Sequence, residues 1–205
     1  MKHKAQTKVI TGPAGDIEVR VKTPKAQAEG LESRLAVISH PHPLYGGTMN
    51  NKVVTTMERA FNHLGYTTVA YNFRGVGRSQ GAYDNGVGEQ DDLKTVTAWA
   101  KAEFASQYAV LAGFSFGSYV TLQAHAHCQV DALCTVAPPV GLYDFSEISE
   151  VGLPWVLIQG GEDEVISAKE ILDWAMAKEN KPDLYWRNQA SHFFHGELIW
   201  LRKVI

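Results

Sequence analysis

The segment YAVLAGFSFGSYV, residues 108 to 120, places a serine between two glycines. A short apolar run leads into Gly113, and Gly117 follows Ser115 by two residues. Glycine has no Cβ, so it lets neighbouring backbone segments approach closely at a sharp strand-to-helix turn. The pattern therefore predicts that Ser115 stands at the end of a strand, where its hydroxyl could act as a nucleophile.

A serine hydroxyl is a weak nucleophile at neutral pH and needs a base to take its proton. Histidine suits this role because its pKa lies near working pH, and a carboxylate is needed to fix its tautomer. Two backbone amides must also stabilise the oxyanion. Polar segments that could supply these groups follow apolar runs: HPHPLYGG after AVIS, GGEDEV after WVLI, and ASHFFHG after LYWRNQ.

The elements that must position these groups alternate along the chain. KVIT and IEVRVKTP flank GPAGD and alternate apolar with polar residues, which predicts an antiparallel hairpin. Strands are predicted at 34–40, 66–73, 108–115, 130–139, 154–161 and 184–189, and helices at 53–65, 88–104, 118–128, 167–180 and 197–205. Such alternation predicts a mostly parallel, twisted sheet with helices on both faces. The polar segments would then meet at the carboxyl ends of the strands.

Length and composition set further limits. A chain of 205 residues predicts a single domain, residues 1–205, and its net charge of −3 offers no footprint for nucleic acid. No run approaches the roughly 18 apolar residues of a membrane span, and no apolar run follows the basic first residues as in a signal peptide. Cys128 and Cys134 are too few for a metal site, and a disulfide between them is disfavoured. We therefore expect a cytoplasmic protein.

Five motifs together resemble the α/β-hydrolase family: HPHPLYGGTMNNKVV, YNFRGVGRSQG, GFSFGSY, GGEDEVI and ASHFFHG. The chain looks closest to a small, capless branch with relatives similar to dienelactone hydrolases and serine aminopeptidases. The resemblance implies the α/β-hydrolase fold without a substantial cap domain, because little chain separates PPVGLYDFSE from PWVLIQ. It implies no metal and no organic cofactor.

The same resemblance assigns the catalytic residues. The nucleophile falls on Ser115, the acid on Asp163 and the base on His192. Asp144, in VGLYDFS, is the rival for the acid, because some family members place it after the preceding strand. His195 is the rival for the base, and we expect it instead to pack against or cap the final helix.

The sequence can identify the backbone amides that would bind the oxyanion only by their position relative to the nucleophile and the strands. One should be the amide of Phe116, directly after the nucleophile. The other should come from the loop after AVIS, where Pro41 and Pro43 have no N–H to donate. Leu44 is therefore predicted as the second donor, with Tyr45 as the fallback.

Without a cap, the substrate pocket should be open and shallow, and it is predicted to be lined by His42, Leu44, Tyr45, Phe116, Tyr143 and Phe194.

These residues predict a serine hydrolase that cleaves a carboxylic ester or thioester of a small-molecule acyl substrate through an acyl-enzyme on Ser115. A peptidase or acyltransferase of the same fold is the alternative within the enzymes, and a non-catalytic α/β-hydrolase-fold binding protein is the alternative outside them.

The glycine-rich RGVGRSQG lacks the context of a nucleotide site, so Arg74 and Arg78 are expected to pair with carboxylates such as Asp91 or Asp92. A homodimer is left open.

Overall fold

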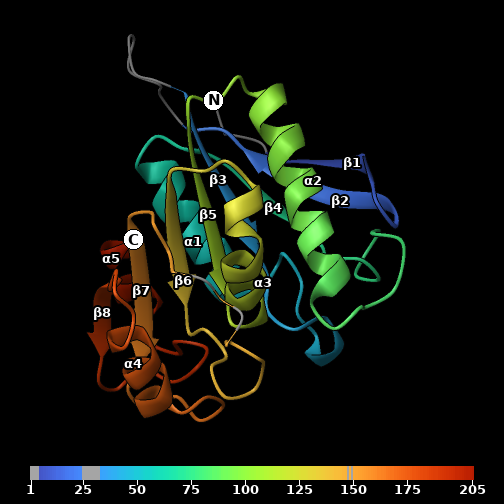
Figure 1. Cartoon of the computed structure of the whole chain (residues 1–205). Coiled ribbons are helices and arrows are strands. Elements are labelled where there is room, and N and C mark those ends of the chain that lie inside the picture. The colour runs from blue at the N-terminus through green and yellow to red at the C-terminus, as the bar shows by residue number, and fades with distance from the viewer. Residues whose placement is uncertain (1–4, 25–32, 147, 149) are drawn as a thin grey trace.

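The computed structural model describes residues 5–24, 33–146, 148 and 150–205, and it shows one eight-stranded sheet flanked by helices (Figure 1). The strand order is β1-β2-β4-β3-β5-β6-β7-β8. The strands are β1 (Gln6–Gly12), β2 (Gly15–Lys22), β3 (Arg34–Ser39), β4 (Thr67–Tyr71), β5 (Tyr108–Phe114), β6 (Ala132–Val136), β7 (Trp155–Gly160) and β8 (Asp183–Arg187).

The predicted N-terminal hairpin and parallel sheet are both confirmed. β1 pairs with β2 antiparallel through a turn that closes at Gly12 and Gly15, and β2 pairs antiparallel with β4. All pairings from β3 to β8 are parallel. Every residue of β4 is buried, as expected of a strand covered on both faces.

Helices cover both faces of the sheet and bury separate apolar cores. α2, α3 and α4 pack on one face, while α1 and α5 pack against each other on the opposite face (Figure 1). The first core includes Leu93 and Leu111, and the second includes Ile38 and Met57. The helices are α1 (Lys52–His63), α2 (Val87–Glu103), α3 (Phe116–Ala124), α4 (Ala168–Met176) and α5 (Leu198–Val204).

Local signals in the sequence set several helix ends. Asn51 begins α1, because its side chain accepts the Val53 N–H at 2.8 Å. Gly65, with a φ of 89°, lies just after its end. Ser167 begins α4 as predicted, with its hydroxyl accepting the Glu170 N–H at 3.3 Å.

No cap domain interrupts the sheet. β6 and β7 are consecutive elements, and the described residues between them form no helix or strand. None of the helices in the described ranges is long and apolar enough to cross a bilayer. The carboxyl ends of the parallel strands therefore open directly to solvent, at the lower end of the molecule in Figure 1.

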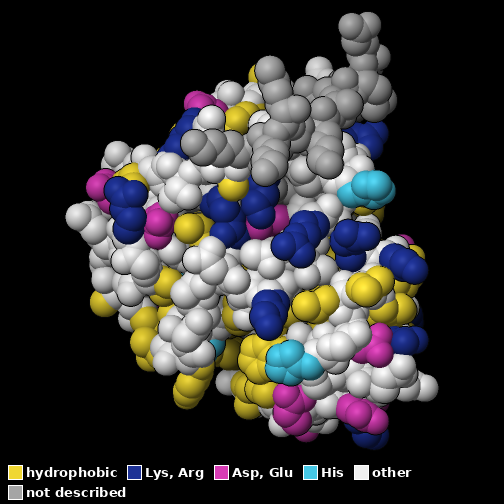
Figure 2. All heavy atoms as spheres, turned by 180° about the vertical axis from the view of Figure 1, so that it is seen from behind, with side chains coloured by type: hydrophobic (Ala, Val, Ile, Leu, Met, Phe, Trp, Pro, Cys, Tyr) yellow, Lys and Arg dark blue, Asp and Glu magenta, His cyan; other side chains and the backbone are white. Residues whose placement is uncertain are grey.

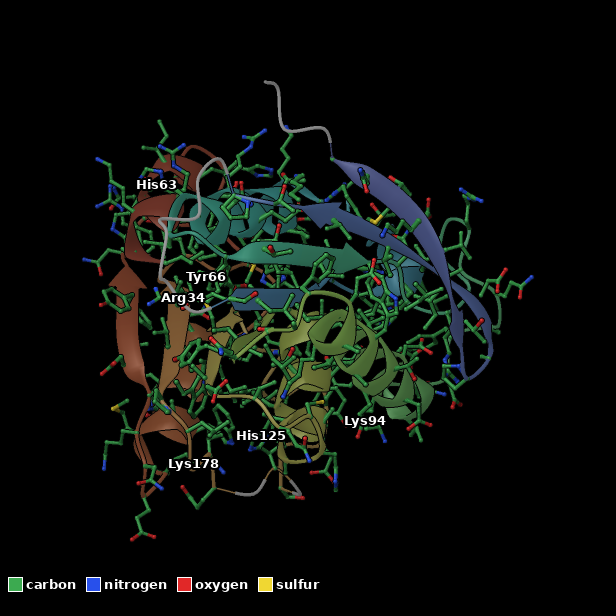
Figure 3. The ribbon with its side chains drawn as sticks, turned by 90° about the horizontal axis from the view of Figure 1, so that it is seen from above. Arg34, His63, Tyr66, Lys94, His125 and Lys178 are labelled. Atoms are coloured by element: carbon green, nitrogen blue, oxygen red, sulfur yellow. The ribbon has the colours of Figure 1, made fainter. Side chains whose placement is uncertain are left out.

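The opposite end of the sheet is built from different contacts. Seen from above, Arg34 and Tyr66 lie close together there (Figure 3), with the guanidinium 5.8 Å from the ring centroid.

Near the carboxyl ends of the strands, Arg74 forms an ion pair with Asp92 at 2.8 Å, which was one of the predicted pairings. Arg78 is exposed, and its backbone N–H donates to Glu18 at 3.0 Å.

Candidate active site

Ser115 lies at the turn between β5 and α3 in a strained backbone conformation. Its φ is 53° and its ψ is −120°, a region that residues with a side chain rarely adopt. Its N–H donates to the Val136 carbonyl of the neighbouring strand at 2.9 Å. The conformation brings the serine to the end of the strand, as the sequence predicts.

The two flanking glycines are required because backbone atoms occupy the space a side chain would need. A Cβ at Gly113 would lie 2.3 Å from the Gly117 carbonyl oxygen, and a Cβ at Gly117 would lie 2.3 Å from the Ser39 oxygen. The second contact also shows that the loop after β3 packs directly on the start of α3. Glycine at these two positions therefore holds the serine turn and the β3 loop together.

His192 links Ser115 to Asp163. Its Nε2 lies 3.1 Å from Ser115 Oγ, and its Nδ1 lies 2.8 Å from Asp163 Oδ2. The side chains of His192 and Asp163 are 3% and 0% exposed, and Ser115 is 9% exposed. An ionised carboxylate can only accept, so Nδ1 carries the proton and Nε2 is free to accept the serine hydroxyl.

The carboxylate of Asp163 is held at both oxygens. Oδ1 accepts the N–H groups of Val165 at 3.0 Å and Ile166 at 2.8 Å, and Oδ2 accepts from His192. Burial opposes ionisation, but the hydrogen bond and charge of His192, with the two backbone donors, lower the pKa of Asp163 below its usual value. Asp163 is therefore an ionised, fixed acceptor at neutral pH.

Both rivals lie outside this arrangement. Asp144 is exposed, and its carboxylate accepts from the backbone and hydroxyl of Ser146. His195 is also exposed and stacks on Phe193, with ring centroids 5.9 Å apart, rather than capping the final helix. Neither rival is hydrogen-bonded to Ser115 or His192 within the described part of the chain.

Two residues that form hydrogen bonds with Asp163 and His192 escaped the sequence analysis. Glu164 accepts the backbone N–H of His192 at 3.0 Å, although an acidic loop residue next to Asp163 is ordinarily only solvated. Gln159 donates to Asp163 Oδ2 at 3.1 Å. The available signal was a glutamine at the end of the otherwise apolar strand WVLIQG.

The predicted second oxyanion donor is not supported by the structure. The Leu44 N–H donates to His42 Nδ1 at 3.1 Å, and the Tyr45 N–H donates to the His42 carbonyl at 3.2 Å. Both amides are therefore used within the loop, which forms a short 3₁₀ turn from Pro43 to Tyr45. The His42 N–H is the first amide after Pro41, and no hydrogen bond from it is found among the described residues.

A buried histidine anchors the start of this loop. His40 is fully buried; its Nδ1 contacts the Pro41 carbonyl at 2.6 Å and its Nε2 accepts the Phe73 N–H at 3.1 Å. Burial lowers the pKa of His40 to about 4, against the opposing effect of the Pro41 hydrogen bond. Burial also lowers the pKa of His42. Both rings are neutral at pH 7, so each can accept the hydrogen bond that shapes the loop.

Ser115 and His192 open into an apolar cavity of about 420 Å³. Of the predicted pocket residues, His42 and Tyr45 line it, while Tyr143 is not among the described lining residues and its ring centroid lies 6.3 Å from that of His42. The prediction that Phe194 lines the pocket was wrong, because Phe194 is fully buried and stacks on Trp200. Its neighbour Phe193 lines the cavity instead. The cavity is lined by Pro41, His42, Tyr45, Gly46, Gly47, Asn51, Ser115, Leu142, Val165, His192 and Phe193.

The mouth of the cavity is apolar and open. Tyr45 and Leu142 are 86% and 61% exposed, and Val165 and Phe193 are also exposed. Figure 2 shows hydrophobic side chains gathered at the lower left of the molecule, toward the end at which the parallel strands finish. None of the described residues that line the cavity is Asp, Glu, Lys or Arg. The described walls of the cavity are therefore mainly apolar.

Comparison with known proteins gives consistent matches. Residues 15–161 match the X-Pro dipeptidyl-peptidase (S15) family. An α/β serine hydrolase without a lid from Xanthomonas campestris is 40% identical, with a TM-score of 0.93 over 100% of this chain and 93% of its own. An α/β serine hydrolase homologue from Coxiella burnetii is 43% identical, with a TM-score of 0.92 over 97% of this chain and 94% of its own. An uncharacterized protein of Rickettsia prowazekii (strain Madrid E) is 37% identical over 96% of this chain and 85% of its own.

Proposed function

Because the chain belongs to the X-Pro dipeptidyl-peptidase (S15) family and to the lidless α/β serine hydrolases, we propose that it is an acyl hydrolase that cleaves a carboxylic ester or thioester. The observation that carries the proposal is the hydrogen-bonded series from Ser115 through His192 to Asp163, at 3.1 and 2.8 Å. This series opens into the apolar cavity, where a small-molecule acyl group can reach the serine.

In the acylation step, Ser115 Oγ attacks the acyl carbonyl carbon while His192 Nε2 takes the hydroxyl proton. Asp163 stabilises the imidazolium through the Nδ1–H. The bond from the acyl carbon to the leaving oxygen or sulfur then breaks, and His192 returns its proton to the leaving group. The acyl group remains on Ser115 as an ester.

In the deacylation step, water takes the place of the leaving group. His192 removes a proton from the water as it attacks the acyl carbon, and then protonates Ser115 Oγ as that oxygen leaves. The products are a carboxylic acid and the original enzyme. Every atom and proton is accounted for by the substrate, water and this chain.

Two amides are proposed to stabilise the oxyanion. Phe116 begins α3, so its N–H has no acceptor within the helix. The His42 N–H is the second candidate, in place of Leu44, because the β3 loop packs on the start of the same helix at Gly117. Such donors stabilise the charge that develops in the transition state.

A peptidase is the second candidate, favoured by the family match over residues 15–161. A dipeptidyl peptidase must hold the α-ammonium group of its substrate, and a carboxylate serves that purpose best. The part of the lining that the structure describes offers no Asp or Glu, and Asp163 is committed to His192. An uncharged acyl ester therefore fits the cavity better than a peptide N-terminus.

The proposal also includes location and assembly. Cys128 and Cys134 are free and buried, in keeping with a cytoplasmic protein. A homodimer stays a prediction. Neither point enters the mechanism.

The first test is labelling by a fluorophosphonate probe, followed by turnover of p-nitrophenyl esters, acyl thioesters and Xaa-Pro-p-nitroanilides. We expect labelling of the wild type, none of Ser115→Ala or His192→Ala, and turnover of esters but not of nitroanilides. Turnover confined to the nitroanilides would replace the esterase with the peptidase. A folded wild type that is neither labelled nor active would favour the non-catalytic binding protein.

A further inference from the structure

Gln159 is a fully buried polar side chain that the mechanism above does not use. It lies near the end of β7, and its Nε2 is 3.1 Å from Asp163 Oδ2 and 2.9 Å from the Gly160 carbonyl oxygen. A carboxylate and a carbonyl only accept hydrogen bonds, so the amide nitrogen must face both. Its orientation is therefore fixed by its neighbours.

The other end of the amide has no partner. Gln159 Oε1 is the buried side-chain polar atom without a hydrogen bond among the described residues. An unsatisfied buried acceptor lowers stability, and an apolar side chain of similar size would avoid that cost. Packing alone therefore gives no reason for a glutamine at this position.

We infer that Gln159 is a positioning residue for the acid of the proposed reaction, an inference that rests on the proposed function. Its N–H and the Nδ1–H of His192 both donate to Asp163 Oδ2. With the Val165 and Ile166 amides on Oδ1, the carboxylate receives four hydrogen bonds. Gln159 thereby fixes the carboxylate plane and draws part of its negative charge away from His192.

Two consequences follow from this second donor. Without it, Oδ2 is held by His192 alone, so the plane of the carboxylate is fixed less firmly and the imidazole is held less accurately toward Ser115. Without it, the carboxylate also stabilises the imidazolium more strongly, and His192 stays protonated to higher pH. A residue with only a packing role would have neither effect.

The test compares Gln159→Met, which keeps length and loses the donor, with Thr135→Val as the matched control. Thr135 is equally buried, lies on the adjacent strand β6, and bonds Trp155 Nε1 at 2.8 Å without touching Asp163. For Gln159→Met we expect kcat to fall about tenfold with KM unchanged, and the acidic limb of kcat/KM to rise by about half a pH unit. Thr135→Val should lose stability while its pH limb stays in place.

Gln159→Glu gives a second, independent variant. A buried glutamate beside the ionised Asp163 stays protonated, because two adjacent carboxylates cannot both ionise, and its O–H can donate to Asp163 Oδ2 in place of the amide. Its kcat and acidic limb should therefore stay closer to the wild type than those of Gln159→Met. A Gln159→Met limb that coincides with the wild type, or a kcat loss equal to that of Thr135→Val, would overturn the inference.

A readout independent of turnover separates this inference from the proposed function. NMR of the His192 ring signals across pH should show their midpoint moving upward from wild type to Gln159→Met and returning toward the wild-type value in Gln159→Glu. If the wild type proves inactive but the midpoints still shift, the proposed function fails and the positioning role stands. Unshifted midpoints in an active enzyme would remove the positioning role alone.

Discussion

The carboxylate of Asp163 accepts the hydrogen bond from Nδ1 of His192, and this contact fixes which tautomer the imidazole holds. Asp163→Asn replaces an acceptor by an amide that can donate to Nδ1 and favour the wrong tautomer. We expect kcat to fall by about a thousandfold or more, with the fold intact. Steady-state kinetics with an ester, together with thermal melting, checks this.

Asp144→Asn is the matched control, since it makes the same chemical change on an exposed carboxylate bonded to Ser146. Its kinetics should equal those of the wild type. A large loss in Asp144→Asn with an active Asp163→Asn would restore Asp144 as the acid.

Burial of the His40 side chain should make the free energy of unfolding depend on pH. Its pKa is lowered by burial to about 4, so the folded state keeps it neutral while the unfolded chain is protonated below about 6.5. The unfolded state then binds more protons, and the free energy of unfolding falls as pH decreases from about 6.5 to about 4, by roughly 3 kcal/mol in total. Urea unfolding at several pH values measures this.

His40→Gln should flatten that dependence, because the titrating group is gone. His63→Gln removes an exposed histidine and should keep the wild-type slope. Equal slopes for His40→Gln and the wild type would show that another group causes the acid loss.

The proximity of Ser115, Asp163 and His192 was predictable because each follows a predicted strand and parallel strands end together. Phe194 was not, because its φ of 52° in the turn after His192 sends it into the core and leaves Phe193 at the cavity. The Leu44 amide was not predictable either, since a side chain in its own loop accepts its hydrogen bond. Such local backbone geometry has no periodic signal in the sequence.

At the scale of elements, the position of α3 against β3 depends on the absence of one side chain. In Gly117→Ala, the added Cβ would lie 2.3 Å from the Ser39 carbonyl and 2.7 Å from the His40 carbonyl. We expect a loss of about 3 kcal/mol in the free energy of unfolding and loss of probe labelling, because α3 must move away from the β3 loop.

Gly152→Ala provides the comparison, since no atom of the described residues lies within 4 Å of the Cβ it would add. Its stability and labelling should match the wild type. If Gly117→Ala behaved in the same way, the close packing of α3 on the β3 loop would not be required for the site.

The elements themselves were largely predictable. The alternation of strands and helices gave the sheet, and cap residues such as Asn51 and Ser167 marked where helices begin. The helix predicted at 118–128 divides into α3 and a 3₁₀ turn from His125 to His127, so its end was wrong. Helix ends depend on tertiary contacts as well as on sequence.

At the scale of the whole molecule, the cavity mouth carries exposed apolar side chains, and these should contribute to substrate selection. Leu142→Ser removes one of them at a position that is 61% exposed. We expect kcat/KM for long-chain acyl esters to fall about fivefold, because apolar contact with the chain is lost, while acetyl esters are unaffected. A chain-length series of p-nitrophenyl esters measures this.

Ile199→Ser makes a similar change on α5, at a residue that is 71% exposed and does not line the cavity. It should leave the chain-length profile unchanged. An equal loss in both variants would mean that surface hydrophobicity in general, rather than the mouth, affects turnover.

The order of the strands has a consequence for how the protein is made. Beyond β5, the strands β6, β7 and β8 join the same edge of the sheet in the order in which the ribosome produces them. His192 lies 77 residues after Ser115, beyond β8. The serine therefore emerges first and has no base until the last strand has been synthesised and paired. Under the proposed mechanism, a nascent chain, or one truncated before His192, cannot hydrolyse a substrate. Hydrolytic activity therefore requires that the sheet be complete.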